Sequence, residues 1–494
     1  MTTNTTIAQE DADDTQELRR VAIDPLSRVE GHGKVTLLLD EQNHVRQARL
    51  HIVEFRGFEK FIEGRPYWEA PVMVQRLCGI CPVSHHLAAA KALDMALGQR
   101  LTPTAEKNRR LMHYGQVLQS HALHFYHLCT PDLLFGFDSD VARRNIVGII
   151  GEYPEIATQG VLLRKYGQEM IHVTAGKKVH GTGAIPGGMN KAISESDRRR
   201  LRTQFTERLD WAQGALALIE KLHSSNKALY DGFGNIPAKT MSLVAPDGAM
   251  DLYHGDLRCR DEAGELIFDQ ADYRKYQELI HEEVKSWSYM KFPYLVQAGR
   301  AEGWYRVGPL ARVQNCDYIP TRLAEEARQN FIRHGGGQIQ HGALANHWAR
   351  MIEMLHALES IGLLLQDDEI SQGEIHSSDP LIEGVRMGIG MIEAPRGTLI
   401  HEYEIGDDDL ITRCNLIVST THNNQVMNES VRAVADRYFD GREVSEGLLN
   451  HIEVAIRAYD PCLSCATHAL GKMPLIVEAL DTEGRCLSRR VKEA

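Results

Sequence analysis

Two short cysteine pairs, placed near opposite ends of the chain, constrain the fold more than any other feature. Cys78 and Cys81 stand in the segment RLCGIC, and Cys462 and Cys465 stand in DPCLSC, 381 positions further on. Cysteines at this spacing can turn both sulfurs toward one metal ion. Four thiolates favour soft metals such as zinc, iron, nickel or copper over magnesium or calcium. If both pairs bind one ion, the two ends of the chain must meet.

The spacing alone leaves several kinds of site open. A structural zinc site uses four such ligands, but zinc ribbons and fingers usually hold both pairs within a dozen or two residues. A dithiol redox site, or two unrelated pairs, would also satisfy the pattern. A site that joins the two ends of a large domain is more typical of a buried functional centre than of a local staple.

Composition excludes several classes of protein. The chain has 494 residues, enough for a large core or two to three packed lobes. A formal charge of −12 argues against nucleic-acid binding, and no apolar run reaches the ~20 residues that membrane insertion needs. Nine cysteines, an odd number, suit reduced thiols. No apolar segment follows Arg19-Arg20, so a twin-arginine signal is not expected, and we expect a cytoplasmic protein.

The pattern of residues predicts a mostly helical α+β chain with small sheets near both termini. Residues 1–20 are polar and acidic and are expected to form a disordered tail. Residues 103–129 predict a long helix, with Thr102 as N-cap and Pro103 in the first turn. The other predicted elements are a helix opened by Pro82, helices near 192–229, 270–289, 321–333 and 341–366, a hairpin at 34–55, a loop at 181–190, and strands within 396–422 and 473–478.

Further segments, in the same order along the chain, make the cysteine motifs resemble the large subunit of NiFe hydrogenases. These are SRVEGHG (27–33), RGFEKFIEGRP (56–66), HALHFYHL (121–128), SWSYMKFPY (286–294), YRVGPLAR (305–312) and EAPRG (393–397). CPVSHH, FRGFEKF and DPCLSCATHALG are most similar to the soluble, cytoplasmic, NAD-reducing branch. The resemblance implies a long-helix bundle core, a catalytic domain over 21–468, and reversible splitting of H2.

The resemblance also implies a Ni-Fe centre. Cys78, Cys81, Cys462 and Cys465 would hold nickel, and Cys81 and Cys465 would bridge to an iron that has CO and cyanide ligands. A metal with an open position makes bound H2 acidic enough to split.

Four residues would then take part in proton transfer. Cys462 or the guanidinium of Arg396 would accept it, Asp460 would pair with Arg396, and Glu30 would relay the proton from Cys462. The family usually has an aspartate as a further partner of this arginine, where this chain has Ser120. We therefore expect Arg396 to be held differently here.

The resemblance places other residues around the centre. His85 would donate a hydrogen bond to a bridging sulfur, and Pro395 would lie beside Arg396. Ser419 or Thr420 would hydrogen-bond a cyanide on the iron. The three histidines His121, His124 and His127 form one helical stripe and are expected to be core residues rather than metal ligands.

A magnesium or similar ion is expected near the Ni-Fe centre. Glu59 and His468 would supply side chains, and a main-chain carbonyl near Asn415 would complete the protein ligands. One carboxylate and several waters are ordinary for this ion.

The chain lacks the means to pass electrons on alone. The remaining cysteines form no CxxC pair, and no GxGxxG dinucleotide motif is present, so no iron–sulfur cluster, flavin or NAD is expected in this chain. The partners that we expect are an iron–sulfur small subunit, together with flavin- and NAD-binding diaphorase subunits. The resemblance further implies nickel-insertion maturation proteins and an endopeptidase that cuts between His468 and Ala469, so that the present chain is an unprocessed precursor with the extension 469–494.

Three competing interpretations remain from the sequence. A respiratory complex I subunit of the same fold lacks the metal cysteines, so both CxxC pairs argue against it. A hydrogenase of the same family that reduces a deazaflavin coenzyme is the second alternative. A zinc-stapled scaffold or interaction protein would contain zinc alone.

Overall fold

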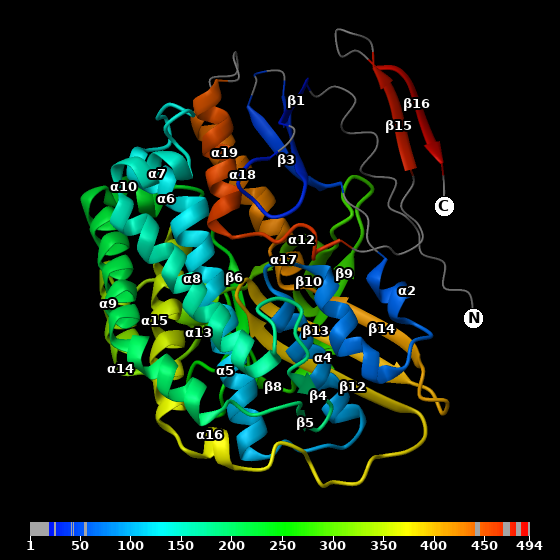
Figure 1. Cartoon of the computed structure of the whole chain (residues 1–494). Coiled ribbons are helices and arrows are strands. Elements are labelled where there is room, and N and C mark those ends of the chain that lie inside the picture. The colour runs from blue at the N-terminus through cyan, green and yellow to red at the C-terminus, as the bar shows by residue number, and fades with distance from the viewer. Residues whose placement is uncertain are drawn as a thin grey trace.

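The computed structural model describes residues 19–23, 26–40, 42, 44–53, 57–439, 445–467, 475–480 and 486–492. Helices dominate this part of the chain, as the sequence predicted, and small sheets lie among them (Figure 1). In the described ranges, every helix is too short or too polar to traverse a lipid bilayer.

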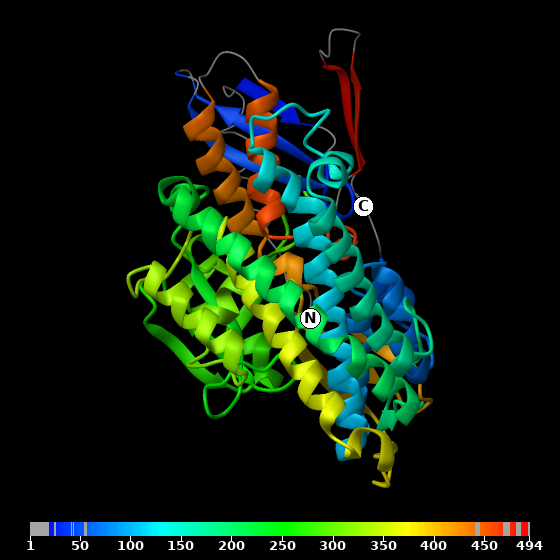
Figure 2. The same ribbon diagram turned by 60° about the vertical axis from the view of Figure 1, so that its left-hand side comes forward.

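Four long helices form the core bundle and pack side by side (Figure 2). They are α5 (Pro103–Leu123), α8 (Pro154–Ala175), α9 (Glu195–Ser225) and α15 (Ala345–Gln366). The start of α5 is as predicted, because the Thr102 hydroxyl accepts a hydrogen bond from the Ala105 amide at 3.2 Å. The predicted helix continues to Cys129 as a π-helical segment, η3 (His124–Cys129).

Shorter helices surround the bundle. These are α2 (Phe58–Ile62), α3 (Ala70–Met73), α4 (Pro82–Ala96), α6 (Thr130–Phe135), α7 (Ile146–Glu152), α10 (Lys227–Gly232), α11 (Tyr276–Leu279), α12 (Gly299–Glu302), α13 (Pro309–Asn315), α14 (Arg322–His334), α16 (Glu369–Gln372), α17 (Ser419–His422), α18 (Asn424–Tyr438) and α19 (Glu446–Ala458). The 3-10 turns are η1 (Tyr67–Glu69), η2 (Val74–Leu77), η4 (Tyr273–Lys275) and η5 (Val296–Ala298). Pro82 opens α4 as predicted, and the predicted helices at 192–229, 321–333 and 341–366 are confirmed.

One helix prediction failed, and one long helix was missed. The helix predicted at 270–289 is wrong, because β9 (Ile280–Glu283) pairs with β10 (Phe292–Leu295) and this pairing overrides local helix propensity. The 22-residue α8 was not predicted, because Gly160 and Gly167 lower the apparent helix propensity of its sequence.

In the described part of the chain, the strands form six small sheets. Two have three antiparallel strands: β1 (Arg19–Ile23), β2 (Gly33–Leu39) and β3 (Val45–Ile52), and β12 (Arg386–Ala394), β13 (Gly397–Ile405) and β14 (Ile411–Ile417). A third, unpredicted sheet has the order β11 (Tyr305–Arg306), β6 (Lys239–Val244), β7 (Asp256–Arg260), β8 (Leu266–Ala271). The pairs β9–β10, β4 (Ala184–Ile185)–β5 (Gly188–Met189) and β15 (Leu475–Leu480)–β16 (Cys486–Lys492) complete the set. The hairpin predicted at 34–55 is β2–β3, the predicted loop at 181–190 contains β4–β5, and the later predicted strands are β13, β14 and β15.

The contact between α4 and β12 requires glycine. A Cβ atom on Gly388 would lie 1.9 Å from the Ala92 carbonyl oxygen, and one on Gly390 would lie 2.1 Å from the Ala88 carbonyl oxygen. The helix backbone therefore rests directly on the strand, and α4 lies across β12 and β13 (Figure 1). Since the first cysteine motif precedes α4 and EAPRG follows from β12, this contact fixes the distance between the two motifs.

We predict that Gly390→Ala will destabilise the protein. The added methyl group meets the backbone of α4 rather than a movable side chain, so overpacking should lower the free energy of unfolding by about 3 kcal/mol. Urea denaturation measures this change. Gly214→Ala in α9 is the control, because nothing lies within 4 Å of its Cβ position. If Gly390→Ala and Gly214→Ala had the same free energy of unfolding, the close contact between α4 and β12 would be refuted.

Candidate metal centre

The N-terminal and C-terminal parts of the chain meet beside α4. Cys78 follows η2, and Cys81 directly precedes Pro82 at the start of α4. Cys462 and Cys465 lie in the turn after α19. The backbone of Glu30 holds this turn, because its carbonyl accepts a hydrogen bond from the Leu463 amide at 3.0 Å and Glu30 forms a β-bridge with Cys462.

The four cysteine sulfurs converge on one point. The Sγ–Sγ distances are 3.2 Å for Cys78–Cys462, 3.7 Å for Cys81–Cys465 and 2.7 Å for Cys462–Cys465, and all four sulfurs lie within 4.8 Å of one another. Each residue is at least 94% buried, and the eight cysteines whose side chains are described are all free thiols. Four buried, unoxidised sulfurs at these distances fit a soft metal centre.

Hydrogen bonding and burial set the charge of this cluster. Contacts with the sulfurs of Cys462, Cys465 and Cys78 hold the pKa of Cys81 well below the usual value of a thiol. Burial raises the pKa values of Cys462 and Cys465 well above that value. Four thiolates cannot share a dry site without a cation, so metal binding is coupled to loss of their protons.

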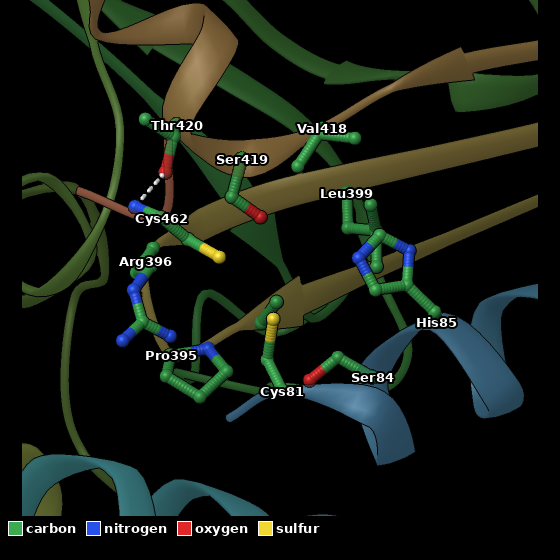
Figure 3. A pocket seen from close by; sticks show the side chains of 11 residues that line it. Cys81, Ser84, His85, Pro395, Arg396, Leu399, Val418, Ser419, Thr420 and Cys462 are labelled. Atoms are coloured by element: carbon green, nitrogen blue, oxygen red, sulfur yellow. Dashed lines mark hydrogen bonds between the residues drawn. The ribbon is translucent and has the colours of Figure 1, made fainter. Parts of the chain in front are cut away.

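Arg396 lies over the cluster at the tip of the β12–β13 hairpin (Figure 3). Ala394 pairs with Gly397, which leaves Pro395 and Arg396 as a two-residue loop. Gly397 has φ +136°, and a Cβ there would lie 2.3 Å from Val307 Cγ2, so this turn requires glycine. The sequence EAPRG therefore places the guanidinium in the same small cavity as Cys81 and Cys462.

The predicted ion pair between Arg396 and Asp460 is present. Arg396 Nε donates to the Asp460 carbonyl oxygen at 2.6 Å, and Nη2 donates to Oδ1 at 3.0 Å. Nη1 is 3.4 Å from the hydroxyl oxygen of Ser120, a long contact to a neutral group. Burial opposes a charged guanidinium, but the Asp460 carboxylate and the cysteine thiolates raise the pKa of Arg396 well above its usual value.

Asp460 is a strained and incompletely satisfied residue. Its φ is +53°, which an aspartate tolerates better than most residues, and its Oδ2 has no hydrogen-bond partner in the described part of the chain. Burial raises the pKa of this carboxyl, whereas Arg396 and then Arg350 act to lower it. Arg350 is thus a second buried cation near Asp460, a neighbour that the sequence did not reveal.

A buried network of Arg312, Glu353 and Glu393 supports the loop that contains Arg396. Arg312 Nη1 donates to Glu393 Oε2 at 2.7 Å and to the Ala394 carbonyl at 2.9 Å, and Nη2 donates to the Pro395 carbonyl at 3.3 Å. Nη2 also donates to Glu353 Oε2 at 2.6 Å. Sequence reasoning missed this role, although Arg312 ends YRVGPLAR and Glu393 begins EAPRG.

The Glu30 side chain contacts the turn that contains the second cysteine pair. The Cys462 thiol donates to Glu30 Oε2 at 3.0 Å, and the Ser464 amide donates to the same oxygen at 3.1 Å. Glu30 is only half-buried, so its carboxylate connects the buried cluster to a more exposed region.

Other predicted residues surround the cavity (Figure 3). A hydrogen bond from His85 is among the contacts that lower the pKa of Cys81. His85 Nδ1 in turn lies 3.1 Å from His401 Nε2. Thr420 Oγ1 accepts a hydrogen bond from the Cys462 amide at 2.9 Å, and Ser419 donates to the Gly397 carbonyl at 2.8 Å.

Cys465 also lines a second small cavity. Glu59, Leu416 and Thr467 are among the residues that line it. Glu59 Oε1 accepts a hydrogen bond from the Leu416 amide at 2.9 Å, and the Asn415 side chain donates to the hydroxyl of Tyr276 instead of entering the cavity. His468 and Ala469 lie outside the described residues.

The histidine stripe on α5 and η3 is largely buried and hydrogen-bonded, as predicted. His121 Nε2 lies 2.8 Å from Glu353 Oε2, and His124 Nε2 lies 2.7 Å from the Arg457 carbonyl oxygen. His124 also lies near Cys129 and His347, but burial and the nearby Arg350 and Arg457 make this group a poor cation site.

Comparison with known proteins identifies the family. A model of the family described as nickel-dependent hydrogenase matches residues 56–135 and 251–468, and a model described as HoxL-like matches residues 20–55. The chain belongs to the nickel-dependent hydrogenase family. This result confirms the resemblance predicted from the two cysteine motifs and excludes the zinc-stapled scaffold as the main function.

Individual relatives are similar to this chain over nearly its whole length. Subunit beta of the NAD-reducing hydrogenase HoxS of Cupriavidus necator is 47% identical, with 96% of this chain and 100% of that protein covered. An F420-non-reducing hydrogenase of Methanothermobacter thermautotrophicus has a subunit that is 39% identical, with 95% of this chain and 99% of that protein covered. A crystal structure of an NAD+-reducing NiFe-hydrogenase in the H2-reduced state has a TM-score of 0.88 and 58% identity, with 91% of this chain and 99% of that chain covered. These matches confirm the predicted fold class and the prediction that the protein is a hydrogenase.

We predict that Arg312→Met will strongly destabilise the protein. Methionine is also unbranched and fills part of the space of the arginine stem, but it leaves Glu353 and Glu393 buried without their cation. This loss should lower the free energy of unfolding by about 3–5 kcal/mol. Urea denaturation measures this cost. The control Arg322→Met removes an exposed arginine paired with Glu326 on the surface, where the effect should be below about 1 kcal/mol. A small effect of Arg312→Met would contradict the role of the network.

Proposed function

We propose that this chain is the H2-activating subunit of a hydrogenase that passes electrons to NAD+. The observation that supports this most is the cluster of four buried cysteine sulfurs under the Arg396 guanidinium, in a chain 47% identical to a subunit of an NAD-reducing hydrogenase. We further propose that the enzyme works in the cytoplasm, where NAD+ is available.

The residues of the cluster suit a Ni-Fe centre. Cys78, Cys81, Cys462 and Cys465 would hold nickel, with Cys81 and Cys465 shared with an iron that has CO and cyanide ligands. When bound, such a centre supplies a Lewis acid that polarises H2 for heterolytic cleavage. Ser419 and Thr420 line the same cavity as Cys81 and Cys462 and would offer their hydroxyl groups to the cyanides.

The chain's own side chains would remove the proton. Cys462 is the acceptor that the geometry favours, because its sulfur already contacts Glu30 Oε2 at 3.0 Å. Glu30 would take the proton onward from the buried cluster. Arg396 uses Nε and Nη2 as donors to Asp460, which suits a fixed positive charge over the cluster better than a base.

Transfer of the electrons from H2 to NAD+ would require partner subunits. The named relative is itself one subunit of a hydrogenase, which implies a multi-subunit complex. In the described part of the chain the cysteines outside the cluster lie singly, at Cys129, Cys259, Cys316 and Cys414. We propose that electrons leave through an iron–sulfur small subunit to flavin- and NAD-binding diaphorase subunits.

Two further features of the family would complete the enzyme. We propose a magnesium or similar ion held by Glu59, His468 and a main-chain carbonyl near Asn415, beside the second small cavity that Cys465 lines. We also propose that maturation proteins insert nickel and that an endopeptidase then cuts between His468 and Ala469, removing residues 469–494. The mass of the chain in active enzyme tests the cleavage.

H2-dependent reduction of NAD+ by the purified complex tests the function directly. We expect activity in the wild type and its loss in Cys78→Ser and Cys465→Ser, since serine oxygen is a poor ligand for a soft metal. Cys316→Ser is the matched control, because that buried thiol lies outside the cluster and contacts the Val313 carbonyl oxygen at 3.7 Å and the Arg328 side chain. Reduction of a deazaflavin coenzyme without reduction of NAD+ would contradict the proposed acceptor.

Glu30→Gln tests the proton route. Glutamine keeps the size of the side chain and an oxygen that can accept from the Ser464 amide, but its amide cannot carry a proton. We expect nickel and iron content to stay unchanged while H/D exchange falls by about 100-fold or more. Glu63→Gln, which alters a carboxylate paired with Lys60 at the surface, should leave exchange unchanged. Undiminished exchange in Glu30→Gln would refute the relay.

A further inference from the structure

A second group of metal-type ligands lies among helix ends, and none of its residues belongs to the cysteine centre. His223 is near the end of α9, Asp231 is on α10, and His334 is the last residue of α14. One ligand atom from each residue lies within 4.8 Å of the others. The three residues come from three separate helices, so the tertiary fold brings them together.

His223 is the most informative member of this group. It is 2% exposed, and its Nε2 has no hydrogen-bond partner among the described residues. The backbone carbonyl of Leu344 accepts a hydrogen bond from the same ring. Tyr230 and Trp348 pack against the ring, with centroid distances of 4.3 and 5.2 Å. The ring is thus fixed, and a buried nitrogen without a partner is costly unless a ligand satisfies it.

A positively charged side chain, that of Lys227, lies beside two of the three ligands. The ammonium of Lys227 is hydrogen-bonded to Asp231 and lies 3.4 Å from His334 Nε2. His334 Nε2 itself lies 3.7 Å from Asp231 Oδ1. Lys227 therefore contacts two of the three ligands, but its side chain is 54% exposed and can swing into solvent.

We propose that His223, Asp231 and His334 form a zinc site that ties the ends of α9, α10 and α14 together. Two imidazoles and one carboxylate are a ligand set that zinc accepts, whereas magnesium and calcium prefer oxygen ligands alone. A backbone carbonyl that fixes the ring of a ligating histidine is also common in such sites. Zinc would displace the Lys227 ammonium, and water would complete its coordination. This site is separate from H2 activation.

Zinc content of the purified complex tests the proposal. The complex, with its Ni-Fe centre loaded, is dialysed against chelator-buffered Zn2+, and bound zinc is measured by mass spectrometry. We expect one zinc per chain in the wild type. His334→Ala should bind zinc at least about tenfold more weakly, because replacing even an indirect partner of a metal lowers affinity about tenfold or more. Lys227→Gln should bind zinc more tightly than the wild type, because it removes the competing cation.

A control variant and a second measurement locate the bound zinc. His281→Ala removes an exposed histidine elsewhere and should leave zinc content unchanged. In crystals of the complex soaked in Zn2+, diffraction at the zinc absorption edge should give an anomalous peak between His223, Asp231 and His334. Equal zinc content in wild type and His334→Ala, or no peak at this position, would overturn the proposal.

Discussion

The convergence of four buried sulfurs is the constraint on which the rest of the structure depends. Two pairs from opposite ends of the chain must lie within 4.8 Å, in a site too dry for four unpaired thiolates. The fold meets this constraint with rigid supports. Helix α4 rests on the glycines of β12, and the backbone of Glu30 pairs with the turn that contains Cys462. Loss of either support would move one cysteine pair relative to the other.

The charges around the cluster form a second layer of support. Asp460 accepts two hydrogen bonds from Arg396, and Arg312 holds the same hairpin loop through the carbonyls of Ala394 and Pro395. Buried ions of this kind are expensive, and they are kept where geometry matters more than stability. Because the Ser120 hydroxyl is neutral, Arg396 depends on Asp460 as its direct carboxylate partner, and Arg350 lies near that carboxylate as well.

Local motifs were predictable from the sequence, and contacts between distant segments mostly were not. The cap at Thr102, the β2–β3 hairpin and the cysteine pairs follow from short patterns of residues, and the resemblance to a family supplied the Arg396–Asp460 pair. The β9–β10 pairing replaced a predicted helix, because a partner strand decides the conformation of residues 280–283. The roles of Arg312, Arg350 and His401 depend on neighbours from other elements, so no local pattern indicates them.

X-ray absorption at the nickel edge, on the mature complex, tests the central claim most directly. If the two cysteine pairs form one Ni-Fe centre, the nickel should have a first shell dominated by sulfur at a count of about four and a heavier iron neighbour beyond it. Replacement of Cys78 or Cys465 by serine should reduce that sulfur count or abolish nickel binding. A nickel shell of nitrogen and oxygen, or zinc in place of nickel in active enzyme, would contradict the account.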